Sequence, residues 1–377
     1  MTVPGSRITR VRTATIRYEL TTPIHYGNWV MRHREFVLVR IDAENGERGF
    51  AYCLSREGPV REIVARSIAP VYEGADASTP SASFYTALWT NHAVHAAGIG
   101  MRALSVVDIA AWDLAARIAS QSIINYLGGT ARALPVTAIV GYPPSMSAAD
   151  VAEQVSGLLA QGWRRFKVPI SPSVDASVER LEAARSAAPD AWIGFDVNMV
   201  FRSTEQVLNF EKRIRGLRLG WIEDVLPPGD AGAVASVRQG SYTPIAVGDE
   251  QGGSYYPEAL LTAGAVDVLR IDATTDGGVT RLPEVIAAAQ ARGVPVAPHM
   301  FPHVHSRLCA AWGIDAPVEW GIPGTGVHPM DDGLEQPIVS GGLMRSLADD
   351  PGFGTLVNLE WIEKQSYEDP DGVLDDL

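Results

Sequence analysis

The chain has 377 residues, of which 46% are hydrophobic and 20% are charged, and its formal net charge is −13. This composition is typical of a globular protein and excludes a largely disordered one. The excess of acidic residues argues against a nucleic-acid or anionic-membrane partner, which would repel it, although a negatively charged substrate can still bind beside a divalent cation.

The sequence shows neither a signal peptide nor a membrane span. The N-terminal segment MTVPGSRITRVRTATI contains no long apolar core, and no run of apolar residues is long enough to cross a bilayer. The two cysteines, Cys53 and Cys309, lie in different predicted domains, so a disulfide framework is not expected. We therefore predict a cytoplasmic protein.

The first third of the sequence predicts an α+β domain. Residues 7–20 and 35–42 alternate between polar and apolar side chains, which predicts two antiparallel strands, and the segment ENGERGFAY turns into a third strand. Between the first two strands, residues 21–34 are expected to form a long loop rich in aromatic and basic groups. Residues 103–119 carry apolar positions at helical spacing, and the LGG that follows ends this helical segment.

From Leu134 onward, short strand-like runs alternate with helical stretches such as AADVAEQVSGLLAQG. The eight candidate strands are PVTAIV, RFKVP, WIGFDV, GWIED, PIAVGD, VDVLRID, VPVAPH and PVEW. Such an alternation is typical of a parallel (β/α)8-type barrel. We predict a capping domain at 1–130, a barrel at 131–325, and a C-terminal segment at 326–377 that packs back on the first domain.

Seven of these strands end in a polar side chain, and successive polar ends are 20 to 29 residues apart. One strand, one helix and two turns need about that many residues. Because catalytic residues of such barrels lie at the C-terminal ends of the strands, we expect all seven side chains to meet at one end. In chain order they are Lys167, Asp196, Glu223, Asp249, Asp272, His299 and Glu319.

Asp196, Glu223 and Asp249 end three consecutive strands and predict a metal site. Converging carboxylates repel one another unless a cation is present, and hard cations such as Mg²⁺ prefer oxygen ligands. Glu250 follows Asp249, but strand side chains alternate in direction, so we assign the ligand role to Asp249 and keep Glu250 as a supporting group or fallback ligand. The alternative is that these acids are solvated or cap helices.

Asp272 and His299 end neighbouring strands. An aspartate that binds one imidazole nitrogen fixes the tautomer and raises the basicity of the other nitrogen. Lys167 lies across the barrel from His299, and Arg165, two residues before Lys167, should lower the pKa of this lysine and make it a base. The alternatives are a structural histidine and a lysine that only binds a carboxylate.

Four further polar residues fall near the same strand ends. Asn198 shares a face with Asp196 and could donate to a substrate oxygen. Glu319 could hydrogen-bond a developing enolate if it is protonated, or form a salt bridge at the rim instead. His303 and His305 are expected to begin the next helix or line its packing face.

Together these motifs resemble the enolase superfamily, specifically the mandelate racemase-like subgroup of the mandelate racemase/muconate lactonizing enzyme family. The resemblance covers about residues 5–365 and rests on RFKVP, DVN, IED, GDE, the later Asp, His and Glu strand ends, and SVVDIAAWDLAAR followed by NYLGG. It implies that an α+β capping domain closes a modified (β/α)7β TIM-type barrel. It also implies that Mg²⁺ binds the substrate carboxylate, that a base removes the α-proton, and that the metal stabilises the enediolate.

The resemblance also implies a role for each site residue. Asp196, Glu223 and Asp249 become the metal ligands. Lys167 and the His299–Asp272 dyad become acid/base groups on opposite faces of the substrate, and Glu319 becomes an electrophilic helper. The loops at 21–34 and 52–59 would determine specificity, with candidate side chains His25, Tyr26, Trp29 and Arg56.

The sequence departs from the family pattern at three positions. The common KxK is RxK, with Arg165 in the first place; the proline that usually follows the strand-four acids is Val225; and the third ligand position holds Asp249 where the subgroup usually has Glu. Arg165 keeps the positive charge near the substrate carboxylate but changes its geometry. The third departure is the reason that Glu250 stays a fallback ligand.

Lys167 and His299 could support either of two reactions. Dehydration of an acid sugar is the activity that the resemblance implies more often, and the basic segment HYGNWVMRHR suits a polyol or diacid better than an aryl group. We predict a hydro-lyase that converts an aldonate or aldarate to a 2-keto-3-deoxy acid, and a homo-oligomer. A racemase or epimerase of a 2-hydroxy acid is the alternative, and a binding protein on a degenerate barrel is the third possibility.

The two proton-transfer groups also predict the stereochemistry of elimination. With Lys167 as the base and His299 as the acid, the elimination is anti. With His299 in both roles it is syn. The expected effect of Arg165 on Lys167 favours Lys167 as the base.

Overall fold

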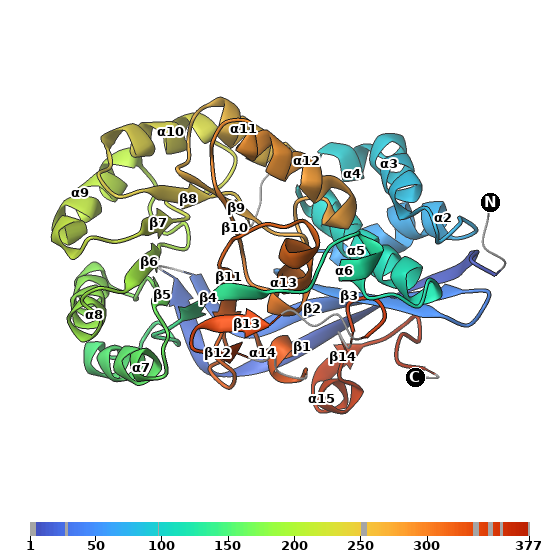
Figure 1. The fold of residues 1–377 in the computed structure, drawn as a ribbon, viewed down its shortest axis with the longest axis horizontal. Coiled ribbons are helices and arrows are strands. Elements are labelled where there is room, and N and C mark those ends of the chain that lie inside the picture. The colour runs from blue at the N-terminus through green and yellow to red at the C-terminus, as the bar shows by residue number, and fades with distance from the viewer. Residues whose placement is uncertain are drawn as a thin grey trace.

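The structure is a computed structural model that describes residues 5–26, 29–96, 98–249, 255–334, 339–345, 350–354 and 357–375. An N-terminal sheet with its helices lies beside a larger ring of alternating strands and helices (Figure 1). Within the described ranges, no helix is both long and apolar enough to span a membrane. Cys53 and Cys309 are buried free thiols.

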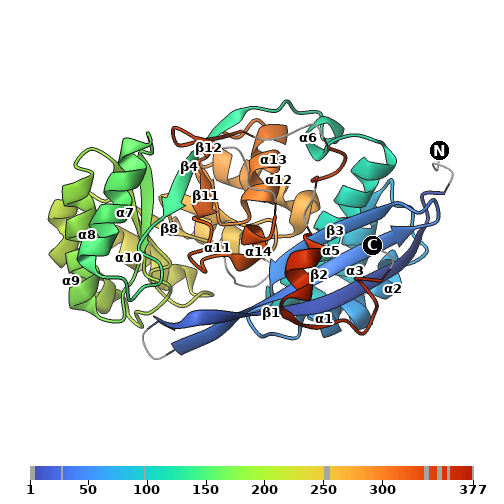
Figure 2. The same cartoon turned by 90° about the horizontal axis from the view of Figure 1, so that it is seen from below.

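The N-terminal part forms a four-stranded antiparallel sheet with the order β14-β1-β2-β3 (Figure 2). Its strands are β1 (Ile8–Tyr26), β2 (Trp29–Ala43), β3 (Arg48–Leu54) and β14 (Ser366–Glu368). The helical segments of this part are α1 (Val60–Ile63), η1 (Val64–Ile68), α2 (Ala69–Tyr72), α3 (Pro80–Thr90), α4 (His92–Ala96), α5 (Gly98–Ile118) and α6 (Ile123–Tyr126).

The long central helix α5 packs directly on β3. At Gly49 of β3, an added Cβ would lie 2.2 Å from the carbonyl oxygen of Ala110 and 2.7 Å from Cβ of Leu114. Only glycine allows the helix to approach the strand this closely. Most residues of α5 are buried, which is the pattern of a helix enclosed on nearly all sides.

The prediction of a long loop at residues 21–34 is wrong. β1 continues to Tyr26 and β2 begins at Trp29, so this segment extends the antiparallel ribbon, with His25 opposite Val30. The register shifts between Glu19 and Ile24, and such an irregularity allows the pairing to resume after the period-two pattern is broken. The ribbon runs from the capping domain toward the barrel in both views (Figures 1 and 2).

The second part has a parallel strand at each of the eight expected positions, which confirms the predicted fold class. The helices between the strands lie on the outside of the ring (Figure 1). The strands are β4 (Ala133–Ile139), β5 (Arg165–Pro169), β6 (Trp192–Asp196), β7 (Trp221–Glu223), β8 (Ile245–Val247), β9 (Val268–Ile271), β10 (Val296–Pro298) and β11 (Val318–Gly321). The helices are α7 (Ala148–Ala160), α8 (Val174–Ala187), α9 (Thr204–Ile214), η2 (Arg215–Leu217), α10 (Ala231–Gly240), α11 (Tyr256–Thr262), α12 (Gly278–Gln290) and α13 (Pro302–Ala311).

Four successive outer helices begin at a side chain that caps the helix. The oxygens of these residues accept a backbone N–H from the first turn, at distances of 2.9 to 3.3 Å. Each cap ends the loop that follows a barrel strand and so helps to hold the loops beside the strand ends. The capping residues are Ser147, Ser173, Ser203 and Asp230.

Side chains bridge one seam of the barrel. The strand order runs from β10 to β4, and β11 pairs with β4, whereas no backbone ladder joins β10 to β11 in the described structure. Glu319 of β11 accepts the backbone N–H of Met300 at 3.0 Å. Arg270 of β9 donates to the carbonyl of Pro298 at 3.1 Å and to Glu319 at 2.9 Å. Charged groups in the interior therefore hold this seam together.

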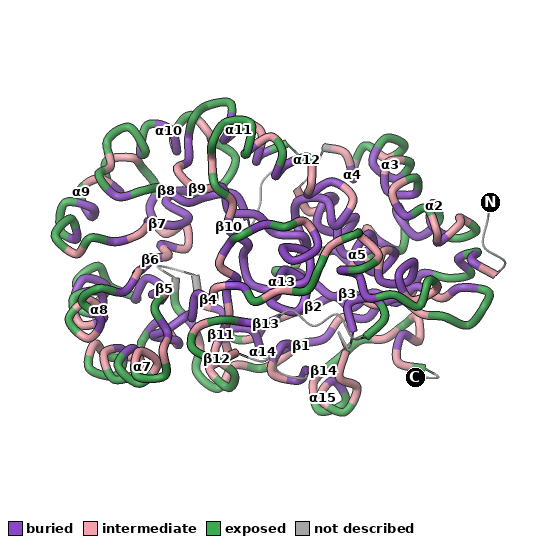
Figure 3. The backbone as a smooth tube through the Cα atoms, viewed as in Figure 1, coloured by how far each residue is buried: buried purple, intermediate pink, exposed green. Residues whose placement is uncertain are grey.

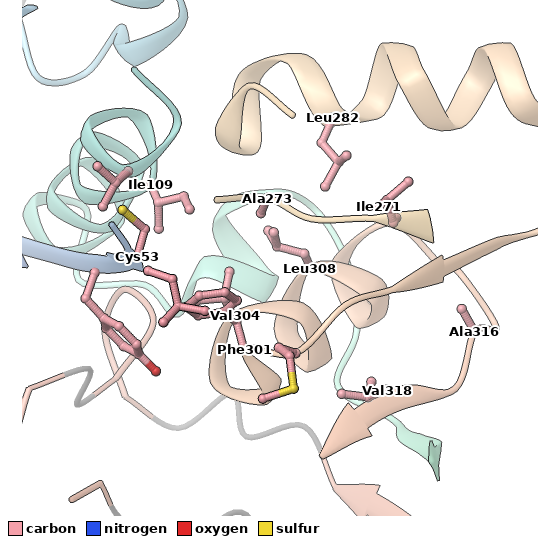
Figure 4. Close-up of a cluster of buried hydrophobic side chains, with 14 of the residues drawn as sticks. Cys53, Ile109, Ile271, Ala273, Leu282, Phe301, Val304, Leu308, Ala316 and Val318 are labelled. Atoms are coloured by element: carbon pink, nitrogen blue, oxygen red, sulfur yellow. The ribbon is translucent and has the colours of Figure 1, made fainter. Parts of the chain in front are cut away.

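The apolar core continues from the capping domain into the barrel. Buried residues dominate the strands and the inner faces of the helices, and exposed residues lie on the outer helix faces (Figure 3). Cys53 and Ile109 of the capping domain face Phe301, Val304 and Leu308 of the barrel within one cluster (Figure 4). The two domains therefore share a core.

Polar contacts also join α5 to the start of α12. Asp108 accepts the backbone N–H of Thr280 at 2.8 Å and its hydroxyl at 2.7 Å, and Ser105 accepts the backbone N–H of Gly277 at 2.9 Å. Gly278 has φ 65°, and an added Cβ would lie 2.3 Å from Oδ2 of Asp108. The loop between β9 and α12 is therefore fastened to the capping domain.

Asp108 makes stability depend on pH. Burial raises the pKa of this carboxyl to about 7, although hydrogen bonds from Thr280 oppose the shift. Because the folded-state pKa lies above the unfolded value, the group stabilises the fold at low pH, and this contribution is lost as pH rises from about 4 to 7. We expect the stability of wild type relative to Asp108→Asn to fall by about 3 kcal/mol between pH 5 and pH 8. Urea unfolding of both proteins measures this difference, and parallel pH profiles would contradict it.

The C-terminal residues contact both parts of the molecule. The hairpin of β12 (Val339–Ser340) and β13 (Leu343–Arg345) adds to β4 in antiparallel fashion, and β14 pairs with β1. Arg40 of β2 donates to the carbonyls of Val373 at 3.0 Å and Asp375 at 2.6 Å. The short helices of this region are α14 (Pro329–Asp332) and α15 (Leu359–Glu363).

Candidate active site

A pocket lies where the C-terminal ends of the barrel strands meet the capping domain. The space between its walls is about 570 Å³, a volume that includes open solvent. Its wall from the capping domain includes Arg34, Leu54 and Arg56. The barrel contributes Ile139, Tyr142, Lys167, Pro169, Asp196, Asn198, Met199, Asp224, His299, Met300, Val327 and His328.

Lys167 of β5 lies among three of the predicted acids. Its Nζ is 3.2 Å from Oδ2 of Asp196 and 2.9 Å from Oε1 of Glu223, and it also pairs with Glu319. Burial favours the neutral amine, but Glu223, Glu319 and Asp196 outweigh burial and hold the pKa of Lys167 well above its ordinary value. In this structure the lysine is therefore an ammonium ion that balances the carboxylates.

The predicted effect of Arg165 on Lys167 is wrong. The guanidinium of Arg165 lies 3.9 Å from the ring centroid of Trp192, and its Nε donates to Oγ1 of Thr137 at 3.2 Å. Arg165 begins β5, so its side chain stays at the opposite end of the strand from the pocket, against an aromatic ring. It is not among the residues that line the pocket, and the neighbouring carboxylates raise the pKa of Lys167, whereas the prediction was that Arg165 lowers it.

Arg270 is the second buried cation of the site, and the sequence analysis did not single it out. Its Nε lies 3.2 Å from Glu223 and its Nη2 lies 2.9 Å from Glu319. A signal was present, because Arg270 interrupts the apolar run VLRI and is two residues before Asp272 on the same face of the strand. A charged residue at an inward position of a buried strand needs a partner of opposite charge.

Glu319 is ionised, which corrects its expected role as a protonated donor. Burial favours the neutral acid, but Lys167 and Arg270 outweigh burial and lower the pKa of Glu319 to about 2. Its carboxylate accepts from Lys167, Arg270 and the Met300 backbone. In this structure it acts as a buried anion that positions two cations.

Asp249 carries two buried oxygens without a hydrogen-bond partner in the described part of the chain, and Oε2 of Glu223 is in the same state. Unpaired buried carboxylate oxygens are costly, and a hard cation would satisfy them. Asp196, Glu223 and Asp249 therefore have the right chemistry for a metal ion. Their described positions do not form a closed cluster of metal ligands, since Lys167 bridges two of them. Glu250 lies outside the described residues.

The predicted dyad is present. Nδ1 of His299 lies 3.0 Å from Oδ2 of Asp272, and Oδ1 of Asp272 accepts the backbone N–H of Thr274 at 2.7 Å. Burial opposes charge on both groups, but their mutual interaction, with Asp249 beside His299 and His305 beside Asp272, raises the pKa of the imidazole and lowers that of the carboxyl. Because Nδ1 is held by Asp272, proton transfer to a substrate falls to Nε2.

The histidines after His299 support the loop that carries Asp272. His305 is buried on α13, and its Nε2 accepts the backbone N–H of Ala273 at 2.9 Å. Its Nδ1 lies 2.7 Å from the carbonyl oxygen of Met300. His303 is also buried on this helix, and burial lowers its pKa to about 4. Both therefore lie on the packing face of α13.

The predicted specificity residues are only partly at the pocket. Arg56 and Asn198 line it, whereas the exposed His25 is not part of its wall. The backbones of Tyr26 and Trp29 belong to β1 and β2, and their side chains lie outside what the structure describes. The sequence analysis missed Arg34, Tyr142, Asp224 and His328, which line the pocket.

Asp224 adds a fourth acid to the pocket wall. Burial raises its pKa well above the ordinary value, and the negative charges of Asp249, Asp196 and Glu223 raise it further. It follows Glu223 directly and has φ 51°, a conformation that is unusual for a residue with a side chain. This backbone turn brings the carboxyl of Asp224 to the pocket wall.

Two family descriptions match most of the chain. Residues 150–361 match the family described as enolase C-terminal domain-like. Residues 8–128 match the mandelate racemase / muconate lactonizing enzyme, N-terminal domain. The first match covers the barrel after β4, and the second covers the sheet strands β1 to β3 and the helices of the capping domain.

Individual proteins are similar over most of their length. A D-galactarolactone cycloisomerase from Agrobacterium fabrum is 29% identical over 306 residues, which is 78% of this chain and 79% of that protein. An L-rhamnonate dehydratase from Saccharopolyspora erythraea is 27% identical over 88% of this chain and 85% of that protein. The crystal structure of a racemase from Streptomyces coelicolor with bound magnesium has a TM-score of 0.84 and 24% identity, covering 95% of this chain and 100% of the other.

Proposed function

Because the chain belongs to the mandelate racemase/muconate lactonizing enzyme family of the enolase superfamily, we propose that it is a lyase that removes the α-proton of an acid sugar and eliminates water, giving a 2-keto-3-deoxy acid. The observation that supports this most strongly is the pocket itself. The His299–Asp272 dyad, Lys167 and a group of carboxylates adjoin one small-molecule cavity. Relatives that are named as a dehydratase and a cycloisomerase of sugar acids support the substrate class.

Asp196, Glu223 and Asp249 would hold a Mg²⁺ ion. All three offer oxygen ligands, and the buried unpaired oxygens of Asp249 and Glu223 are suited to a cation. A structural relative with bound magnesium is consistent with this choice. When bound, Mg²⁺ supplies positive charge beside the substrate carboxylate and so stabilises the negative charge that develops as the α-proton leaves.

His299 is the residue that we assign as the base. Three carboxylates contact Lys167 and hold its pKa well above the ordinary value, so this ammonium is a poor base, whereas an imidazole gives up its proton more readily than an amine does. Asp272 holds Nδ1, so Nε2 of His299 accepts the α-proton and the C–H electron pair begins to form the new double bond. This assignment replaces the preference for Lys167, which depended on the effect of Arg165.

The same imidazolium then donates its proton to the β-hydroxyl. The C–O bond breaks, water leaves, and the resulting enol tautomerises to the 2-keto acid, so atoms and charge balance. Because one residue serves both steps from one side of the substrate, the elimination is syn. Lys167 supplies positive charge on the other side of the pocket, with Glu319 and Arg270 fixing its environment.

A library of aldonates and aldarates tests the proposed function. With Mg²⁺ present, we expect at least one member to give a 2-keto acid, and we expect EDTA to stop the reaction and added Mg²⁺ to restore it. Solvent deuterium should appear at the α-carbon of recovered substrate if proton removal is reversible. Absence of both keto acid and exchange across the library would contradict the proposal.

Asp249→Asn is expected to remove the dependence on Mg²⁺ together with the activity. The amide keeps one neutral oxygen but loses the charge that favours a divalent cation. Wild type should melt at a higher temperature when Mg²⁺ is added, because a ligand that binds the folded state stabilises it, and the variant should show a much smaller increase. If Glu250→Gln loses both effects while Asp249→Asn keeps them, the ligand is Glu250.

Racemisation or epimerisation of a 2-hydroxy acid is the second candidate. The pocket contains two groups that can carry protons, Lys167 within β5 and His299 directly after β10, and racemisation needs one such group on each side of the α-carbon. Inversion of configuration without any keto acid, across the same library, would favour this activity over dehydration.

A further inference from the structure

Arg34 of β2 is a buried cation without a carboxylate partner in the described structure. Its residue is 7% exposed, and it lines the active-site pocket. Its Nη2 donates to the hydroxyl of Tyr142, which is a neutral group, and its Nε has no hydrogen-bond partner within the described residues. A buried guanidinium is stable only when its charge is compensated.

Three of the other buried arginines show ways in which this chain meets that requirement. Arg270 pairs with Glu223 and Glu319, and Arg40 lies 2.6 Å from Asp42. Arg180 has no acidic partner among the described residues, but it donates to the carbonyls of Pro144, Pro169 and Gly141, and it does not line the pocket. Arg34 differs from all three, because it combines a single neutral partner with a place in the pocket wall.

His328 lies on the same pocket wall and offers a second polar atom. It is 3% exposed, its Nδ1 is 3.0 Å from Oδ2 of Asp331, and its Nε2 has no partner within the described residues. Phe36, two residues after Arg34 on the same face of β2, contacts the ring of His328 edge to face, with the centroids 5.3 Å apart. Phe36 therefore connects β2, the strand that carries Arg34, to the ring of His328, and both Arg34 and His328 line the same pocket.

We infer that Arg34, with Tyr142 and His328, binds a second carboxylate at the far end of the substrate, so that the enzyme acts on six-carbon diacids (aldarates) in preference to the matching monoacids. This inference rests on the proposed function. One carboxylate of the substrate belongs beside Asp196, Glu223 and Asp249. The planar guanidinium of Arg34 matches the geometry of the second carboxylate, and the low polarity of a buried site strengthens the ion pair between them.

A carboxylate suits this end of the pocket better than a phosphate. Asp196 also lines the cavity, and a doubly charged phosphate would add more negative charge there than a singly charged carboxylate. One guanidinium, one hydroxyl and one imidazole can satisfy the oxygens of a single carboxylate. Preference for a phosphorylated monoacid over the aldarate would overturn the inference.

The experiment compares kcat/KM for an aldarate and for the aldonate of the same hydroxyl configuration. We expect wild type to prefer the aldarate. Arg34→Gln should lower kcat/KM for the aldarate by about 10- to 100-fold, mostly through KM, because one charged hydrogen-bonding partner is lost. The value of kcat/KM for the aldonate should change little. Arg34→Lys should recover part of the preference. Arg10→Gln, an exposed arginine at the other end of the ribbon, is the control and should leave both values unchanged.

Failure of the inference can be told apart from failure of the proposed function. If wild type turns over aldonates as well as aldarates, and Arg34→Gln affects both equally, the diacid site is wrong and dehydration stands. If no sugar acid is turned over, the affinities for adipate and hexanoate, measured by calorimetry, decide whether the second carboxylate site exists. Tighter binding of adipate that Arg34→Gln abolishes supports the site, and equal affinities overturn it. Circular dichroism of each variant confirms that it is folded.

Discussion

Replacing His299 by Asn is expected to abolish both keto-acid formation and α-proton exchange. The assignment of Nε2 as the base, with Asp272 fixing Nδ1 at 3.0 Å, makes this imidazole responsible for removing the α-proton and protonating the leaving hydroxyl. General acid–base groups contribute about 10²- to 10⁴-fold, so a loss of about 10³-fold or more in kcat is expected. The measurement is turnover in D₂O, with keto acid and deuterium incorporation followed in the same reaction.

Asp272→Asn should also reduce turnover and α-proton exchange, but by less than His299→Asn does. The amide leaves His299 in place but removes the charge that holds the tautomer and raises the pKa, so kcat should fall strongly while KM changes little. His92→Asn, an exposed histidine on α4, is the control and should behave as wild type. If His299→Asn retains exchange without dehydration while Lys167→Met loses exchange, Lys167 is the base and the elimination is anti.

Arg270→Met is expected to cause the largest loss of stability. The change leaves Glu223 and Glu319 without their guanidinium partner and removes a donor to the carbonyl of Pro298. Removing one partner of a buried ion pair typically costs about 3–5 kcal/mol, because the remaining charge stays buried. We also expect activity to fall, since Glu319 and Glu223 contact Lys167. Urea unfolding and turnover measure the two effects.

Arg238→Met is the matched control for Arg270→Met. Arg238 pairs with Asp267 at 2.9 Å, but the two side chains are 41% and 33% exposed, so the pair is screened by water. Its loss should cost less than about 1 kcal/mol. Equal effects of the two substitutions on the free energy of unfolding would show that Arg270 does not hold the barrel seam.

The regular spacing of the polar strand ends was the sequence feature that predicted most of the barrel and of the candidate site. The polar residues from Lys167 to Glu319 lie within or just after strands that the structure places in one parallel barrel, and His299 contacts Asp272 as expected. Such predictions succeed because strand period and barrel geometry are local or repetitive properties of the chain. The ribbon at 21–34 was missed because a bulge interrupts the alternation that identifies strands.

The charge states of the site could not be predicted in the same way. Lys167 has a raised pKa and Glu319 a lowered one because four strands bring their charges together, and only the assembled barrel determines those distances. Arg165 illustrates the point. The sequence correctly predicted that it lies on the same strand as Lys167, but its guanidinium packs on Trp192. Arg34 was missed because it reaches the pocket from the other domain.

The return of the C-terminal residues to the first sheet has a consequence for synthesis on the ribosome. Arg40, only 3% exposed, depends on the carbonyls of Val373 and Asp375, and Thr13 donates its hydroxyl to Asp371 at 2.8 Å. These partners are translated after every strand of the barrel. The sheet of β1 and β2 is therefore completed only after the barrel strands have been made, and a nascent chain must keep β1 and β2 from pairing with other chains until residues 371–375 have emerged.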